Sequence, residues 1–477
     1  MFSSQKLRQS IYSGNDKTLI DDWEKLIELK KENMKENEEL ILQLEKSIVN
    51  KSHTYIDKQQ SFNIDCEQIR ESLDIGEGAI ELFALNLPIE GEDADELIYY
   101  GLLLRKEFNY PLFIELGVED EISGYIYNSD YDSLSNIIWE SLKPFFEGLE
   151  TIYIAPSGIL HNVSFAGLKK EGRYLCEDYT IHNLLSTKDI IKLKDQKEDS
   201  SKSRQIALFG GADFLLPNHE LSLLDRDSED SGDNYLTRSM LNEMDPLRGP
   251  GFMYLPGTKR EVESINQHLT ALNWKTSLFT DKAATETRFK SLSSAESPDV
   301  IHISTHGFYF PQPKIDFSDK DGVDLLSGNQ EQNIYRLSDN PLMRSGLAFT
   351  GANHVWKGND PVKGTDDGIL TAYEISNLNL FNTELVVLSA CNTGLGDIDH
   401  GEGVYGLQRA FRMAGVQTMI VSLWEVPDKE TVELMTAFYT FWGEGMTKKE
   451  AFDKAQMKMR YIYPDQPEKW SGFIMIE

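Results

Sequence analysis

Two short stretches decide the fold of this chain: Val300-Ile301-His302-Ile303-Ser304-Thr305-His306-Gly307 and Leu385-Val386-Val387-Leu388-Ser389-Ala390-Cys391-Asn392-Thr393-Gly394. Each begins with an apolar, β-branched run that is typical of a buried parallel strand. Each ends in a small or glycine-bearing turn, with a histidine at the mouth of one strand and a cysteine at the mouth of the other. Because ligands collect at the carboxyl ends of strands in an open α/β sheet, we expect His306 and Cys391 to meet there.

Strands and helices alternate from residue 151 onward. Apolar runs predict strands at 152–155, 206–209, 275–279, 300–304, 385–389 and 418–423, and helical spacing predicts helices at 259–269, 285–292, 402–414, 428–442 and 448–460. This alternation favours an α/β fold, a mainly parallel sheet with helices on both faces. Two long polar loops, 213–256 and 311–341, are expected to lie over the strand ends, as functional lids do.

The chain before residue 151 has a different pattern. Residues 18–49 have apolar side chains at helical spacing, which predicts an N-terminal helical arm. This arm is either a surface helix packed on the body, the tail of a helical-repeat array, or a docking arm for a partner. Apolar runs at 79–84, 96–104 and 111–116 predict strands, and 133–147 predicts a helix broken at Pro144. We therefore divide the chain into a helical region (1–60), a strand-rich part (61–150) and an α/β domain (151–477).

Composition excludes several classes of function. The 477 residues include 47 Lys and Arg against 78 Asp and Glu, a net charge of −31, and no basic run that would bind nucleic acid directly. An acidic chain of this kind favours basic partner segments or serves solubility alone. No run of about eighteen apolar residues predicts a membrane span, and residues 1–13 lack the apolar core of a signal peptide.

Cysteine and histidine spacing gives no support for a metal or a disulfide framework. The three cysteines (Cys66, Cys176 and Cys391) have no zinc-type spacing, and His161, His182, His354 and His400 are scattered. Three sparse cysteines fit a reducing compartment, so we expect a cytoplasmic protein without metal or cofactor.

The two strand ends together supply the groups of a thiol nucleophile with its own base. Cys391 would be partly exposed near free backbone amides, a setting that lowers a thiol pKa, as does a neighbouring imidazolium. Gly307 leaves its amide open to a ligand beside His306. The backbone amides of Gly307 and Cys391 are therefore our candidates for an oxyanion hole.

A series of ordered segments resembles the CHAT family, caspase-like peptidases named for their association with tetratricopeptide repeats. The resemblance covers about residues 79–477 and rests on eight segments: Ile154-Ala155-Pro156-Ser157-Gly158-Ile159-Leu160, Leu255-Pro256-Gly257-Thr258-Lys259-Arg260-Glu261-Val262, Ser304-Thr305-His306-Gly307, 340–353, 367–375, Leu388-Ser389-Ala390-Cys391-Asn392-Thr393-Gly394, 401–407 and 422–428. It implies a caspase-like sheet and a cysteine endopeptidase mechanism, with His306 and Cys391 as the catalytic pair.

Substrate preference does not carry over from this resemblance. The caspase signature Gln-Ala-Cys is absent, and Ser389 stands where metacaspases place an aspartate that holds a basic side chain. Candidate pocket residues are Asp397, Asp399, Glu402 and Trp424, although the first two also fit solvated loop charges. A backbone carbonyl or Glu374 is our candidate for orienting His306.

The sequence therefore predicts a regulated cysteine endopeptidase that cleaves a specific protein substrate. The alternatives are a catalytically silent scaffold that binds proteins and a docking module built on the N-terminal arm. The resemblance further implies a regulatory protein or an RNA-guided effector as partner, and a role in bacterial antiphage defence or signalling.

Overall fold

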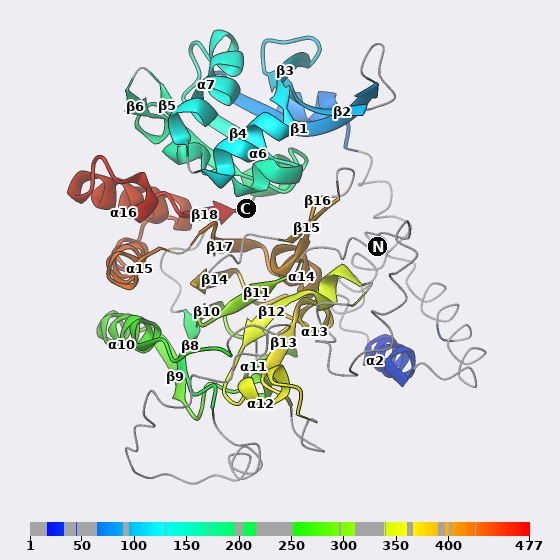
Figure 1. Cartoon of the computed structure of the whole chain (residues 1–477), viewed down its shortest axis with the longest axis vertical. Coiled ribbons are helices and arrows are strands. Elements are labelled where there is room, and N and C mark those ends of the chain that lie inside the picture. Colours follow the sequence, from blue (N-terminus) through cyan, green and yellow to red (C-terminus); the bar gives the residue numbers. More distant parts are fainter. Residues whose placement is uncertain are drawn as a thin grey trace, which may run out of the picture.

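A computed structural model describes residues 17–32, 44, 64–88, 95–128, 130–170, 172–195, 204–215, 251–294, 297–310, 338, 340–359, 366–389, 396–399, 403–424 and 426–477. An eleven-stranded sheet runs through this part of the chain (Figure 1). Its strands, in spatial order, are β3 (Leu112–Val118), β2 (Asp95–Arg105), β1 (Glu77–Pro88), β4 (Thr151–Ala155), β7 (Thr180–Asn183), β18 (Phe473–Ile476), β17 (Thr418–Ser422), β14 (Leu385–Ser389), β10 (Val300–Ser304), β8 (Gln205–Ala212) and β9 (Lys275–Asp281).

The sheet contains two sets of parallel strands that run in opposite directions. Strands β1, β4, β7 and β18 are parallel to one another, and we call them the first strand set. Strands β17, β14, β10, β8 and β9 are likewise parallel, and we call them the second strand set. The sets meet where β18 pairs antiparallel with β17, so their strands end at opposite edges.

The second strand set is covered by helices on both faces, as the buried runs predict. All five residues of β10, β14 and β17 are buried. One face packs on α10 (Pro256–Ala271), α15 (Asp428–Gly443) and α16 (Lys448–Ile462). The other packs on α11 (Glu286–Lys290), α13 (Ala372–Ser376) and α14 (Leu407–Ala414). The predicted α/β class, a mainly parallel sheet between two helical layers, is confirmed.

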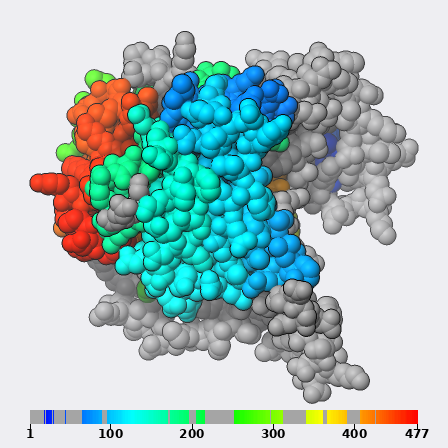
Figure 2. All heavy atoms as spheres, turned by 90° about the horizontal axis from the view of Figure 1, so that it is seen from above, coloured from blue at the N-terminus to red at the C-terminus, as the bar shows by residue number. Residues whose placement is uncertain are grey.

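The first strand set has its own covering helices. The helices α6 (Glu119–Tyr127) and α7 (Tyr131–Leu142) pack on one face, and α5 (Cys66–Ser72) and α8 (Asp189–Asp195) on the other. The α7 helix ends before Pro144, where the 3-10 turn η3 (Lys143–Phe145) follows, as proline requires. Seen from above, this region (blue to teal) lies beside the orange and red α15 and α16 (Figure 2).

Smaller elements surround the two strand sets. A three-stranded sheet consists of β11 (Gly307–Tyr309), β12 (Ser345–Ala348) and β13 (Ile369–Thr371), next to α12 (Asn353–Trp356). Two hairpins pair β5 (Lys169–Lys170) with β6 (Arg173–Tyr174) and β15 (Gly396–Asp399) with β16 (Gly403–Gly406). Short 3-10 turns are η4 (Gly158–Asn162), η5 (Phe165–Gly167), η6 (Leu175–Glu177), η10 (Pro341–Met343) and η11 (Pro467–Lys469).

One predicted helix is described only in part, and another begins later in the structure than predicted. The N-terminal arm contains α2 (Lys17–Glu32), and most of the remainder of 18–49 lies outside the described residues. The helix predicted at 402–414 was wrong at its start: α14 begins at Leu407, and β16 occupies the preceding residues. The glycines at 401, 403 and 406 disfavour a helix there because glycine loses the most backbone entropy on ordering. The division at residues 60 and 150 stays a prediction.

Candidate active site

The strands that carry the predicted pair are neighbours in register. Strands β10 and β14 pair in parallel, with Ser304 opposite Ser389. In the sequence, His306 and Cys391 each follow their strand's serine by two residues. The structure describes His306, whereas Cys391 lies outside the described residues.

A backbone carbonyl contacts the ring of His306. Its Nε2 lies 2.8 Å from the Met253 carbonyl oxygen. The rings of Phe214 and Phe252 flank it, with centroids 5.2 Å and 5.5 Å away. When Nε2–H donates to this carbonyl, Nδ1 is the ring nitrogen that accepts a proton. The arrangement therefore holds the imidazole in the tautomer that a general base needs.

The segment that supplies this carbonyl is itself held by one buried side chain. The amide of Phe252 donates to Asn353 Oδ1 (2.7 Å), and Asn353 Nδ2 donates to the Phe252 carbonyl (2.8 Å). Asn353 is buried, although Met253 next to the clamp is exposed. A rigid pair of hydrogen bonds thus fixes the backbone that orients His306.

The amide of Gly307 points away from the small sheet. The Ala348 amide donates to the His306 carbonyl (2.9 Å), so His306 faces β12. Successive residues of a strand turn their backbone groups to opposite sides, which directs the Gly307 N–H to the other side. Because β11 is an edge strand, this direction suits an amide that receives an oxyanion.

A buried carboxylate connects the two strand ends. Glu261 Oε2 accepts from Ser304 Oγ (2.6 Å) and from Ser389 Oγ (3.0 Å). These serines are register partners, one in each strand, so a single oxygen links β10 to β14 at their carboxyl ends. Glu261 is only 3% exposed.

The same carboxylate extends the network into the core. His302 Nε2 lies 3.0 Å from Glu261 Oε1, and His302 Nδ1 lies 3.1 Å from the Tyr439 hydroxyl. Burial, together with the charge of Glu261, raises the pKa of Tyr439 well above its usual value, so the hydroxyl keeps its proton. His302 is therefore a satisfied core residue, whereas His306 four residues later is only partly buried.

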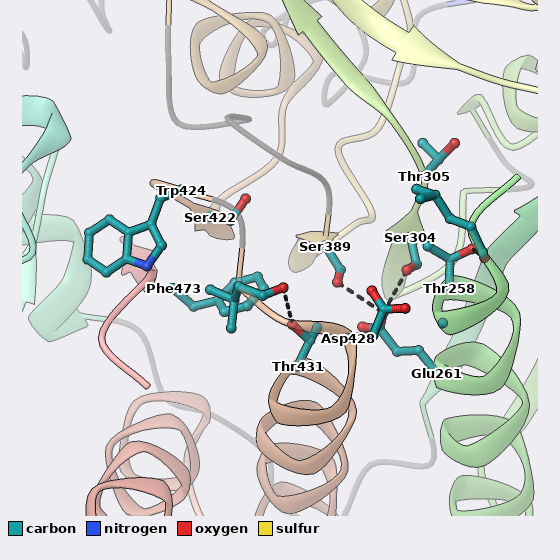
Figure 3. A pocket seen from close by; sticks show the side chains of 13 residues that line it. Thr258, Glu261, Ser304, Thr305, Ser389, Ser422, Trp424, Asp428, Thr431 and Phe473 are labelled. Carbon is teal, nitrogen blue, oxygen red and sulfur yellow. Dashed lines mark hydrogen bonds between the residues drawn. The ribbon is translucent and has the colours of Figure 1, made fainter. Parts of the chain in front are cut away.

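A cavity opens at the carboxyl ends of three central strands (Figure 3). Its space not filled by atoms, including the part open to solvent, is about 490 Å³. Thirteen residues line it: Leu255, Gly257, Thr258, Glu261, Ser304, Thr305, Ser389, Ser422, Trp424, Val426, Asp428, Thr431 and Phe473. Thr305 directly precedes His306, so the cavity adjoins the predicted base.

The predicted pocket residues have different positions. Trp424 lines the cavity and donates from Nε1 to the Glu468 carbonyl (2.9 Å). Asp397 and Asp399 belong to β15, opposite Tyr405 and Gly403 in the hairpin, and Glu402 lies outside the described residues. The role suggested for Glu374 was wrong, because its carboxylate caps α13 through Thr371 and pairs with Lys290 (2.8 Å). The alternative, a backbone carbonyl, is the one that contacts His306.

Glu261, Asp428 and Asn353 were missed by sequence reasoning. One signal was available for Glu261: it lies four residues before Ile265 and eight before Leu269, on the apolar stripe of its helix. A carboxylate on such a stripe indicates a buried charge with a specific purpose. Asn353 follows a glycine-bearing turn and carried no comparable signal.

The described residues give no support for a metal site or for a membrane-spanning helix. In this part of the chain no group of three or more His, Cys, Asp or Glu side chains is arranged to hold a metal ion. None of the described helices combines the length and apolar character required to cross a bilayer.

Comparison with known proteins identifies one family over most of the chain. The CHAT domain matches residues 131–477. Tetratricopeptide repeat protein 28 from Mus musculus and from Homo sapiens are 31% and 32% identical over 109 residues, which are 23% of this chain and 4% of each relative. The chain thus spans a small fraction of the length of these relatives.

Two solved structures share weaker similarity. The Arg-specific cysteine proteinase gingipain R has a TM-score of 0.40 at 9% identity, over 75% of this chain and 73% of its own. The separase of the Saccharomyces cerevisiae separase–securin complex has a TM-score of 0.46 at 9% identity, over 90% of this chain and 31% of that one.

Proposed function

The chain belongs to the CHAT domain family, and on that premise we propose that it is a cysteine endopeptidase, with Cys391 as nucleophile and His306 as general base. The observation that supports the proposal is the parallel register of β10 and β14, the strands that His306 and Cys391 follow in the sequence, together with the contact of the His306 imidazole with the Met253 carbonyl. A thiol beside an oriented imidazole is the arrangement that forms a reactive thiolate.

The reaction follows from the roles of these groups. His306 Nδ1 takes the thiol proton, and Cys391 Sγ forms a bond to the peptide carbonyl carbon. The Gly307 and Cys391 amides donate to the oxyanion of the tetrahedral intermediate, where one such donor contributes about 3 kcal/mol. The imidazolium then returns the proton to the amine nitrogen as the C–N bond breaks, which leaves a thioester on Cys391.

Water completes the cycle. His306 removes a proton from a water molecule as its oxygen attacks the thioester carbon. The C–S bond breaks, the new carboxylic acid leaves, and the thiolate takes up the proton held by the imidazolium. No other reactant is consumed, so the net change is hydrolysis of one peptide bond.

The proposed substrate is a protein, and the finer expectations rest on the family resemblance alone. They are control by a regulatory protein or an RNA-guided effector, and action in antiphage defence or signalling. A cytoplasmic location is expected from the sparse cysteines instead. These stay predictions, as does a pocket role for Asp397, Asp399 and Glu402.

A cleavage assay tests the proposal. The wild-type chain and Cys391→Ala are incubated with a library of proteome-derived peptides, and new termini are identified by mass spectrometry. Cys66→Ala is the matched control because Cys66 is an exposed free thiol outside the site. We expect new termini with the wild type and Cys66→Ala and none with Cys391→Ala. Equal cleavage by Cys391→Ala would contradict the assignment of Cys391 as the nucleophile, and no cleavage by any variant would favour a silent scaffold.

A further inference from the structure

The cavity beside the candidate pair has an unusual balance of charge. Of the thirteen described residues that line it, Glu261 and Asp428 are acidic and none is basic. Glu261 lies at the buried end, between Ser389 and Ser304, and Asp428 lies close by at the start of α15 (Figure 3). A buried carboxylate is costly to maintain unless a cation or several hydrogen-bond donors offset its desolvation.

The hydrogen bonds of Glu261 leave room for one more donor. Its two oxygens offer about four acceptor positions, and the donors from Ser304, Ser389 and His302 fill three. The other ring nitrogen of His302, Nδ1, lies 3.1 Å from the Tyr439 hydroxyl. In the described part of the chain, no lysine or arginine lies within ion-pair distance of the Glu261 carboxylate, whose donors are two hydroxyls and the His302 ring.

The second carboxylate depends on a glycine for its position. A Cβ placed on Gly257 would lie 1.9 Å from Asp428 Oδ2, which no real structure tolerates. The lack of a side chain at residue 257 therefore lets Asp428 approach the first turn of α10. Asp428 is exposed, so it can meet a ligand that enters from solvent.

Aromatic side chains form the remaining wall. The Trp424 indole is fixed by its bond to the Glu468 carbonyl and lies 5.9 Å, centroid to centroid, from Tyr131. Phe473 lines the cavity next to it. Long cationic side chains pack their methylene stems on such surfaces while the charged end reaches a carboxylate, and an indole face also attracts a cation.

We propose that this cavity binds a basic side chain, lysine or arginine, of the substrate residue that immediately precedes the cut, with Glu261 as the charge at its floor and Asp428 as the charge at its mouth. The inference rests on the proposed function, because Thr305 and Ser389 place the cavity one and two residues from the base and the nucleophile. Ser389 stands where metacaspases place an aspartate. In the structure, its hydroxyl donates to a carboxylate from α10, that of Glu261.

The net charge of the chain supports a basic ligand. At −31, the protein attracts cationic segments from solution and accelerates their encounter with the site. Neutral side chains of similar length would fill the cavity but would leave the Glu261 charge unpaired.

The test compares matched peptides that differ only at the residue before the cut: arginine, lysine, norleucine or glutamate. Hydrolysis by the wild type, Glu261→Gln and Asp428→Asn gives kcat/KM for each peptide. Glu263→Gln is the control, since it removes a charge from the exposed face of the same helix. Direct binding of the same peptides to Cys391→Ala, measured by fluorescence anisotropy, reports on the cavity without turnover.

We expect arginine and lysine peptides to be cleaved and bound at least tenfold better than norleucine. Glu261→Gln should remove most of that preference, Asp428→Asn should reduce it severalfold, and Glu263→Gln should retain it. Asp428 is exposed, so its variant reports even where Glu261→Gln does not fold.

The possible failures are distinguishable. Cleavage with equal rates for basic and norleucine peptides, or an equal loss for every peptide in Asp428→Asn, would overturn the cavity assignment and leave the peptidase standing. Preferential binding of basic peptides to Cys391→Ala without cleavage by the wild type would overturn the peptidase and support the cavity. Neither cleavage nor preferential binding would overturn both.

Discussion

Charged side chains beside the two strand sets of the sheet have different partners. In the first strand set, His182 pairs with Glu477, and Lys194 pairs with Glu77 at the start of β1. Next to the second strand set, Glu261 accepts from two serine hydroxyls and the His302 ring, and His306 Nε2 contacts a carbonyl. Both carboxylates named in the first strand set face a basic side chain, whereas Glu261 has hydroxyl and imidazole donors beside a cavity. We infer that the first set serves stability and that the second carries the chemistry.

The largest expected effect separates a histidine of each set. His306→Ala should lower kcat/KM by about 10³-fold, because it removes the proposed base. His182→Ala should change it by less than about threefold once the protein is shown to be folded, since the contacts of His182, a pair with Glu477 and a ring stack on Tyr153, are structural. Steady-state hydrolysis of one fluorogenic peptide measures both, and a comparable loss in folded His182→Ala would break the comparison.

Stability at low pH should depend on the first strand set. Burial lowers the pKa of His161, in η4 after β4, to about 4. The unfolded chain takes up this proton near pH 6.5 and the folded chain only near pH 4, so stability is complete above pH 6.5 and is lost as the pH falls toward 4. The loss from this residue should be about 3 kcal/mol.

Urea unfolding at a series of pH values measures this loss. His161→Gln should flatten the curve between pH 6.5 and 4, whatever its effect on stability at neutral pH. An unchanged slope would show that His161 titrates normally in the folded protein.

Loosening the segment that orients His306 should have a smaller effect. Asn353→Ala removes both hydrogen bonds to Phe252 and frees the Met253 carbonyl beside the imidazole. We expect kcat to fall about tenfold with little change in KM, because positioning and not substrate contact is lost. Asn359→Ala is the control. Asn359 is exposed, and its side chain donates to the carbonyl of His354, a residue of the helix α12 that also contains Asn353. A rise in KM with an unchanged kcat would contradict the positioning role.

The smallest expected effect lies at the mouth of the cavity. Gly257→Ala places a methyl group where Asp428 now lies, so the carboxylate must move. Cleavage after arginine should fall a fewfold relative to norleucine, with a change in stability of about 1 kcal/mol. Competition between the two peptides in one reaction measures the ratio, and an unchanged ratio would show that Asp428 does not contribute.

The sequence predicted most of the second strand set because its strands are unbroken buried runs. The runs at 300–304 and 385–389 match β10 and β14 as the structure has them. Strand register and the meeting of β17 with the antiparallel β18 come from pairings far apart in the chain, which local pattern does not encode.

The candidate pocket was harder to predict for the same reason. From the sequence, we predicted pocket carboxylates close to Cys391, at Asp397, Asp399 and Glu402. The carboxylate that accepts from Ser389 is instead that of Glu261, which precedes Ser389 by 128 residues. Only the sheet brings α10 beneath both strand ends. The acidic residue on the apolar stripe of that helix was the single local indication.

The most direct test of the central claim is the pH dependence of thiol alkylation by iodoacetamide, followed residue by residue with peptide mapping. Cys66 is an internal exposed reference, and burial raises the pKa of Cys176 to about 12, which keeps it unreactive. We expect the alkylation rate of Cys391 to reach half its maximum at a pH at least one unit below that of Cys66. We also expect His306→Ala to remove this difference. Equal midpoints for Cys391 and Cys66 in the wild-type protein would contradict the central claim.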